Sequence, residues 1–172
     1  MTKERILVTY ASKHGATAEI AEGIGAVLLK RGMEVDVMAI DRASDLAGYA
    51  AIVLGVALYM GNWRKEAVRF LKQNEAELSG KPFWLFLSGP SGVGDPIELL
   101  KGRQVPPSLQ GLLDRIKPRE VTVFHGALTP EKISGFERWI IKRVKAATGD
   151  FRDWSAIESW ATSVAAGFVP QA

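Results

Sequence analysis

Apolar residues along the chain follow two different periods. Five short stretches are either almost wholly apolar or alternate between apolar and polar residues, which is typical of β-strands. The stretch at residues 50–56 is an almost unbroken apolar run, as expected for a central strand of a parallel sheet. In chain order, the five predicted strands are residues 6–9, 34–39, 50–56, 83–87 and 121–124.

Between the strands, apolar residues recur with the spacing of an α-helix. Ile20, Ile24 and Leu28 share one face of a helix predicted over residues 17–30, and Gly32 ends that helix. Three further helices are predicted at residues 63–78, 134–147 and 154–167. Because strands and helices alternate, right-handed crossovers predict a doubly wound parallel sheet of the α/β class.

Residues 88–118 interrupt this alternation. The segment joins the fourth and fifth predicted strands, is rich in Gly and Pro, and is predicted to hold two short helices around residues 97–101 and 107–116. Long connections in compact domains often carry function. Residues 92–116 could act as a lid or a docking segment, or they could simply connect the two strands. Both alternatives remain open.

Length and composition limit the classes of protein. The 172 residues suit one domain, which we predict to span residues 1–172. Hydrophobic residues make up 47% of the chain, yet no run approaches the ~20 apolar residues that cross a bilayer. Cys is absent, which excludes disulfides and thiolate chemistry and is compatible with a cytoplasmic location. The two His residues lie far apart in the sequence, so no metal site is predicted.

The formal net charge of +3 is mildly basic. This balance argues against a carrier that docks through a strongly acidic face, and it favours an anionic partner such as a carboxylated substrate or a membrane surface. The alternative is that the Lys and Arg side chains only keep the surface solvated and bind no anionic partner. We expect a small-molecule partner and no nucleic acid.

The stretch from Ile6 to Thr17 predicts a phosphate site. A buried strand is followed by a short loop and then by a helix, whose first N–H groups have no partner within the helix and carry partial positive charge. The hydroxyls of Ser12 and Thr17 can add hydrogen bonds, and Gly15 lets the backbone approach an anion closely.

Three loops are expected to meet beyond the carboxyl ends of the strands, at residues 10–17, 56–63 and 88–94. The first binds phosphate, the second offers aromatic side chains, and the third supplies hydroxyls and backbone groups without bulk. This combination predicts a flat, monophosphorylated heterocycle, and FMN fits that description. The predicted cofactor-binding residues are Ser12, Lys13, His14, Gly15, Ala16, Thr17, Ala57, Leu58, Tyr59, Met60, Gly61, Ser88, Gly89, Pro90 and Ser91. Tyr59 and Trp63 could each stack on a flavin ring, and we favour Tyr59.

The residues that other functions of this fold class require are absent from the sequence. A phosphate-accepting receiver domain needs acidic residues after the first and third strands, and residues 10–12 contain none. Gly89-Pro-Ser-Gly-Val-Gly94 lacks the Lys of a P-loop. His14 and His125 are the only His residues, and no Gly-x-Ser-x-Gly nucleophile elbow accompanies them.

The residues quoted above resemble those of flavodoxin-like FMN proteins, and most resemble the menaquinone-dependent protoporphyrinogen oxidase branch of that family. The phosphate loop is similar to the family pattern Ser/Thr-x-x-Gly-x-Thr, and the likeness extends over nearly the whole chain. The chain departs from the branch at Ala57, at Tyr59-Met60 and in the mixed charges of its long loop. The matching segments are Ser12-Lys-His-Gly-Ala-Thr17, Val53-Leu-Gly-Val-Ala-Leu-Tyr-Met-Gly61, Gly126-Ala-Leu, Phe136-Glu-Arg-Trp-Ile-Ile-Lys, Thr148-Gly-Asp and Asp153-Trp154.

The resemblance implies a flavodoxin-like three-layer sandwich with a five-stranded parallel sheet of order 2-1-3-4-5. It also implies an FMN-dependent enzyme that oxidises protoporphyrinogen IX, passes electrons to a membrane quinone and contacts the membrane peripherally. The flavin would carry the chemistry, so no catalytic side chain is predicted. A flavodoxin-type electron carrier or an NAD(P)H:quinone reductase would use the same loops and remains open. The helix at residues 134–147 could face anionic lipid or substrate propionates, or simply pack on the sheet, and its basic residues are Arg138, Lys142, Arg143 and Lys145.

Overall fold

A parallel β-sheet forms the centre of the molecule. The computed structural model describes residues 4–12, 15–59, 62–89, 94–128 and 149–168. Its five parallel strands lie in the order β2-β1-β3-β5-β6, which is the predicted order 2-1-3-4-5 when these strands are counted along the chain. They are β1 (Arg5–Ala11), β2 (Glu34–Ala39), β3 (Ala51–Tyr59), β5 (Phe83–Ser88) and β6 (Glu120–Phe124).

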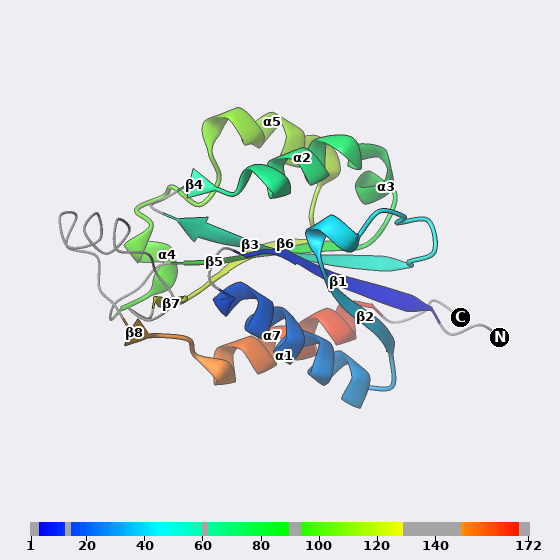
Figure 1. Cartoon of the computed structure of the whole chain (residues 1–172), viewed down its shortest axis with the longest axis horizontal. Coiled ribbons are helices and arrows are strands. Elements are labelled where there is room, and N and C mark those ends of the chain that lie inside the picture. Colours follow the sequence, from blue (N-terminus) through cyan, green and yellow to red (C-terminus); the bar gives the residue numbers. More distant parts are fainter. Residues whose placement is uncertain (1–3, 13–14, 60–61, 90–93, 129–148, 169–172) are drawn as a thin grey trace.

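Helices cover both faces of the sheet and give the predicted three layers (Figure 1). One face is covered by α1 (Ala16–Lys30) and α7 (Trp154–Gly167), which pack against each other. The other face is covered by α2 (Lys65–Gln73), α3 (Glu75–Ser79) and α5 (Pro107–Ile116). Alternate residues of β1 enter the two cores, with Ile6 and Val8 facing α1 and Leu7 facing the opposite layer.

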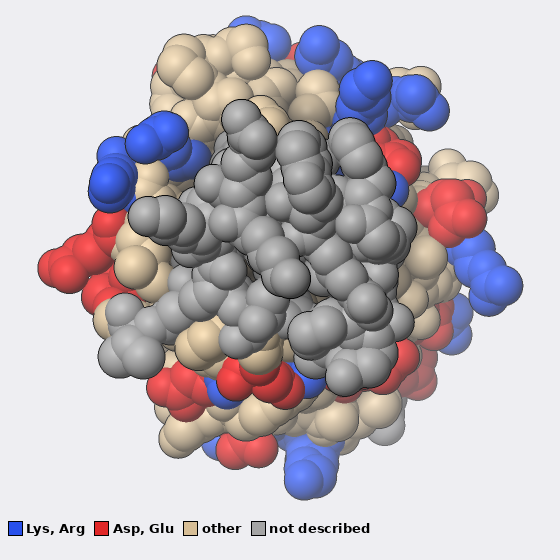
Figure 2. Space-filling view, turned by 60° about the vertical axis from the view of Figure 1, so that its left-hand side comes forward, with Lys and Arg blue, Asp and Glu red and all other residues tan. Residues whose placement is uncertain are grey.

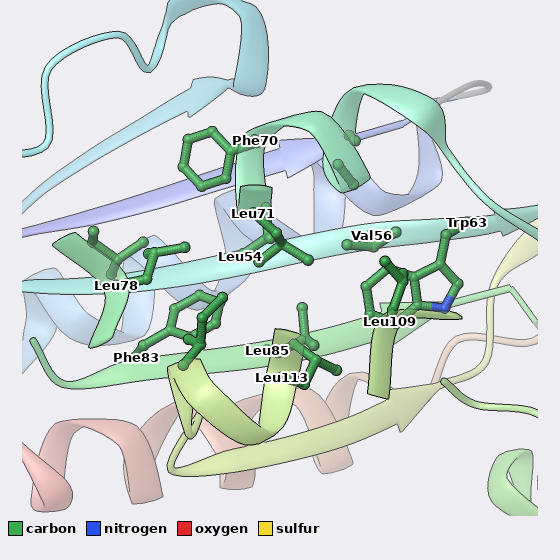
Figure 3. Close-up of a cluster of buried hydrophobic side chains, with 14 of the residues drawn as sticks. Leu54, Val56, Trp63, Phe70, Leu71, Leu78, Phe83, Leu85, Leu109 and Leu113 are labelled. Carbon is green, nitrogen blue, oxygen red and sulfur yellow. The ribbon is translucent and has the colours of Figure 1, made fainter. Parts of the chain in front are cut away.

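Each face of the sheet has its own hydrophobic core. Beneath α2, α3 and α5, buried side chains from β3 and β5 meet those of the helices (Figure 3). Beneath α1 and α7, the rings of Phe86, Phe124 and Trp160 contact one another with centroids 5.7–6.0 Å apart. Gly55 lies opposite Phe86 in the sheet, and a Cβ atom at Gly55 would lie 2.1 Å from Cζ of that ring. The aromatic cluster therefore occupies space that only glycine leaves free.

The single helix predicted over residues 63–78 is wrong. Residues Asn62–Trp63 form a short strand, β4, that pairs antiparallel with the end of β3, and the helix begins only at Lys65. It then breaks between α2 and α3 at Asn74, where the side-chain amide donates a hydrogen bond of 2.9 Å to the carbonyl oxygen of Phe70. Asn side chains that bond to nearby backbone in this way compete with the helical hydrogen-bond pattern.

The long connection between β5 and β6 holds the two helices expected there. The first, α4 (Pro96–Leu99), is one turn long and is capped by Asp95, which accepts hydrogen bonds from the amides of Ile97 and Glu98. The second, α5, has the predicted bounds. A 3₁₀ turn, η1 (Ile40–Arg42), follows β2.

Two further short strands were not predicted. They are β7 (Ala127–Leu128) and β8 (Gly149–Asp150), which pair antiparallel after the end of β6. The helix predicted at residues 134–147, with its basic side chains, lies outside the described residues. Among the helices that the structure does describe, none has the length and apolar character needed to cross a bilayer.

Candidate functional site

The carboxyl ends of the parallel strands lie together at one end of the sheet. The chain leaves β1, β3, β5 and β6 on this side, at the left of Figure 1. Figure 2 turns this side forward and shows Lys, Arg, Asp and Glu side chains interspersed around its rim. Ligands of open α/β sheets bind at this end, so the predicted site residues are taken up here in the order of their strands.

Ser12 and Gly15 shape the turn between β1 and α1. Gly15 adopts a left-handed conformation with φ of 86°, and its amide donates a hydrogen bond of 3.0 Å to Ser12 Oγ. This contact fixes the hydroxyl oxygen as an acceptor and leaves the hydroxyl hydrogen free to donate to a ligand. The side chain of Ser12 thus supports the loop and remains a donor toward an anion.

The first turn of α1 offers backbone donors at the same place. No described side chain caps this helix, and Ala16 and Thr17 occupy its first two positions. Thr17 is 2% exposed, so its side chain lies within the loop–helix junction. Uncapped amides at a helix N-terminus bind anions. The donors present on these residues therefore fit the phosphate group of FMN.

Ala57, Leu58 and Tyr59 belong to a strand, which corrects the loop predicted for them. They are the last three residues of β3, and Leu58 and Tyr59 pair with Trp63 and Asn62 of β4. The antiparallel pairing continues the strand because it satisfies backbone groups that a loop would expose to water. Tyr59, the aromatic residue expected to line this side of the site, therefore lies on a β-hairpin.

Trp63 packs into the core and is not placed to stack on a ligand. It is 7% exposed and lies in the buried cluster of Figure 3. Its indole Nε1 donates a hydrogen bond of 2.8 Å to the carbonyl oxygen of Gln104. Tyr59 is half-buried at the end of β3 and remains the aromatic candidate. The preference for Tyr59 over Trp63 rests on this difference in packing.

Ser88 and Gly89 bring the end of β5 against its neighbours. Ser88 is the last residue of the strand and is 2% exposed, whereas a loop position was predicted. A Cβ atom at Gly89 would lie 2.6 Å from the carbonyl oxygen of Leu58, and one at Gly126 would lie 3.1 Å from Cα of Gly89. The chain at the ends of β3, β5 and β6 thus comes into close contact at Leu58, Gly89 and Gly126.

Six of the predicted site residues lie outside the described residues, so their roles stay predictions. They come from all three loops and are Lys13, His14, Met60, Gly61, Pro90 and Ser91. At the β6 end, ring Nε2 of His125 lies 2.6 Å from the carbonyl oxygen of Gly94, which places this His in contact with the start of the long connection. Within the described residues, no group of three or more His, Asp or Glu side chains could hold a metal ion.

The segment that begins with β8 contributes contacts that the sequence did not predict. We call residues 149–154 the strap. The amide of Phe151 donates a hydrogen bond of 3.1 Å to the carbonyl oxygen of Gly126, and Arg152 forms ion pairs with Asp150 and with Glu19 of α1. The resemblance had marked residues 148–150 and 153–154 but gave them no role. A contact between residues 133 positions apart leaves no local signal in a single sequence.

The ion pairs hold Arg152 as a guanidinium ion. Its side chain is only 10% exposed, and hydrogen bonds to Asp150, together with one to Glu19, raise its pKa above the usual range. The cation also lies 5.1 Å from the centre of the Trp154 ring. The strap is therefore fixed to α1 by a charge that stays in place at all ordinary pH values.

Comparisons with known proteins agree with the fold described above. The chain is similar to the protoporphyrinogen IX dehydrogenase [quinone] of Escherichia coli K12, with 20% identity over 94% of each chain. Among solved structures it is similar to oxidised flavodoxin 2 from Bacillus cereus, with 24% identity, a TM-score of 0.63 and coverage of 95% and 99% of the two chains. A flavodoxin from the domain Archaea has 15% identity, a TM-score of 0.61 and coverage of 95% and 97%.

A match to a family model shows which protein family the chain belongs to. The model of the flavodoxin domain matches residues 7–155, a range that begins in β1, includes the whole predicted phosphate loop and ends at the start of α7. The similar structures share the fold over almost the full length of the chain. Because the family match spans most of the sequence, the chain belongs to the flavodoxin domain family, and this membership indicates FMN as its cofactor.

Proposed function

We propose that this protein is an FMN-dependent oxidoreductase of the protoporphyrinogen IX dehydrogenase type, which passes electrons from a porphyrinogen to a quinone. The observation that carries the proposal is the similarity to such a dehydrogenase over 94% of both chains. That similarity includes the region beyond β6, where the strap and α7 lie. Because quinones of this kind reside in membranes, the proposal includes a peripheral contact with a membrane surface.

The chain's own residues would hold the cofactor at its two ends. The hydroxyls of Ser12 and Thr17 and the amides that begin α1 would bind the phosphate group. Leu58, Tyr59 and Gly89 would line the ring end, with Tyr59 as the stacking side chain and backbone groups as donors and acceptors. The flavin, when bound, supplies the transfer of electrons or hydride. The protein orients it and excludes water, and no side-chain nucleophile is required.

A flavodoxin-type electron carrier is the second candidate. It is favoured by the likeness in fold to flavodoxins over the full length of those chains, and it would use the same binding residues. The two functions differ in what they require beyond the flavin. An oxidase needs a place for its porphyrinogen substrate, whereas a carrier needs only a docking surface for redox proteins.

The deciding experiment measures substrate turnover by the fully loaded protein. The purified protein is saturated with FMN, its absorption spectrum is recorded, and protoporphyrinogen IX is added with menadione as a soluble quinone. We expect porphyrin fluorescence to appear at a rate that depends on both the protein and the quinone. Fully loaded protein without porphyrin formation would contradict the oxidase proposal. Reduction of menadione by NAD(P)H under the same conditions would then indicate a quinone reductase, and its absence would leave the carrier.

A further inference from the structure

One side of α2 is buried and the other is basic. Phe70 and Leu71 point from α2 into the core beneath it (Figure 3). On the outer side, Lys65, Arg69 and Lys72 are exposed, and their spacing of four and then three residues places them on one face of the helix. They therefore form a line of cations along the surface of α2, which we call the basic row.

The basic row borders a hollow in the surface, with a volume of about 370 Å³. The side chains that line it are Trp63, Lys65, Val68, Arg69, Lys72 and Gln73. Trp63 and Val68 are its apolar members, and the hydrogen bond from Trp63 to the carbonyl oxygen of Gln104 holds this end of the hollow against the long connection between β5 and β6. The hollow thus combines apolar side chains with three cations.

No carboxylate pairs with the basic row in the part of the chain that the structure describes. Glu66 is the acidic residue of α2, and it bonds to Arg64 at 2.8 Å. Both acidic residues of the neighbouring α3 form ion pairs with other cations, Arg115 and Lys81. The 3₁₀ turn η1, which also contacts α2, carries one charge of each sign. Residues 64–73 therefore present a net charge of +3 to the solvent.

We propose that the basic row docks the protein on a membrane surface that contains anionic lipids. This inference rests on the proposed function, in which electrons pass to a quinone, and it assigns the surface of contact. The helix α2 begins shortly after β4, and β4 pairs with the end of β3 at Tyr59, the candidate stacking residue. A membrane that contacts the basic row therefore lies on the side of the molecule to which this hairpin leads.

The chemistry of a lipid surface matches both parts of the hollow. The phosphate groups of anionic lipids attract the three cations, and each Lys or Arg near such a surface strengthens binding about fivefold. The aliphatic stems of these side chains and the half-buried Val68 suit the boundary between headgroups and acyl chains, where the charged ends stay in water. Because the attraction is electrostatic, it weakens as the salt concentration rises.

The test measures binding of the FMN-loaded protein to lipid vesicles by sedimentation at low salt. Vesicles of phosphatidylglycerol, which are anionic, are compared with vesicles of phosphatidylcholine, which have no net charge. We expect the native protein to bind the anionic vesicles more tightly and to leave them at high salt. The double variant Lys65→Gln/Arg69→Gln should bind them about 25-fold more weakly, and Lys72→Gln should add a further loss of about fivefold.

A matched control removes the same two kinds of charge from the opposite face of the sheet. Lys30 and Arg31 are exposed at the end of α1. The double variant Lys30→Gln/Arg31→Gln has the same net charge as Lys65→Gln/Arg69→Gln and should keep its affinity for anionic vesicles within about threefold. Equal losses in the two double variants would show that only the net charge acts and would overturn the inference. Native protein that binds neither kind of vesicle, or both equally, would also overturn it and would indicate an acidic protein as the partner of the basic row.

The turnover assay separates this inference from the proposed function. Menadione is soluble, so porphyrin formation in that assay needs no membrane, and Lys65→Gln/Arg69→Gln should proceed at the native rate. Vesicle binding through the basic row by a protein that forms no porphyrin would contradict the oxidase and keep the docking surface. Porphyrin formation by a protein that does not bind anionic vesicles would overturn the docking surface and keep the oxidase.

Discussion

Single glycines set how closely the backbones of neighbouring strands approach one another. Gly89 and Gly126 allow the ends of β3, β5 and β6 to touch, and Gly55 makes room for the ring of Phe86 inside the sheet. In each case the constraint is the neighbouring atom, because these glycines do not have the left-handed φ that Gly15 has. The space around a glycine therefore determines whether it can be replaced.

Gly55→Ala is expected to destabilise the protein by about 1–3 kcal/mol, because its methyl group would displace the buried ring of Phe86. Urea unfolding followed by circular dichroism measures the difference. Gly48 is the matched control, since no atom lies within 4 Å of a Cβ built there. Gly48→Ala should change stability by less than about 1 kcal/mol. A similar cost for both substitutions would contradict the packing argument.

Substitution of another single residue, Thr17→Ala, tests whether the FMN phosphate binds beside the hydroxyl of Thr17. Removal of the hydroxyl is expected to weaken FMN binding by roughly 1.5–3 kcal/mol, which is about one to two decades in Kd. Thr17→Ser keeps the hydroxyl and should retain most of the affinity, and riboflavin affinity should be unchanged in both variants. FMN affinity that is unaltered in Thr17→Ala would refute the placement of the phosphate beside this residue.

At the scale of elements, the bounds of α5 and α7 were predictable because their signals are local. Asp153 accepts a hydrogen bond from the amide of Ala156 and caps α7, and Pro107 begins α5. The break at Asn74 and the β4 hairpin were missed because the apolar pattern continues through both. The strap was missed because its partners lie far away in the sequence.

The cap of α7 provides a prediction about one whole element. Asp153→Ala is expected to lower the free energy of unfolding by about 0.5–2 kcal/mol, since the Ala156 amide loses its acceptor. Asp153→Asn keeps an acceptor oxygen and should cost much less. Thermal unfolding of the two variants provides the measurement. Equal melting temperatures for the alanine and asparagine variants would argue against the cap.

At the scale of the whole molecule, the order of the five strands was predictable from the alternation of elements together with the family resemblance. The site was predictable only in part, because Ser12, Gly15 and Thr17 lie on a local strand–loop–helix unit. The meeting of Leu58, Gly89 and Gly126 depends on strand ends that come together only in the finished sheet.

Global stability should depend on alkaline pH through Tyr49. Its hydroxyl donates a hydrogen bond of 2.8 Å to Asp36 Oδ2, and burial, followed by this bond, raises its pKa from 10.0 to about 12. The folded state therefore favours the neutral phenol. The resulting stability is fully present below pH 10.0 and is lost as the pH rises toward about 12. In Tyr49→Phe, the fall in the urea midpoint between about pH 9 and about pH 11.5 should be smaller than in the native protein. An equal fall would contradict this assignment.

The position of the strap in the chain has a consequence for how the protein matures in the cell. During synthesis at roughly 5–20 residues per second, β1 and α1 leave the ribosome long before residues 149–154. Until α7 follows them, the apolar face of β1 and α1 that it covers stays open to chaperones. We therefore expect the contacts between Arg152 and Glu19 to form late in synthesis, only once residues 149–154 have left the ribosome.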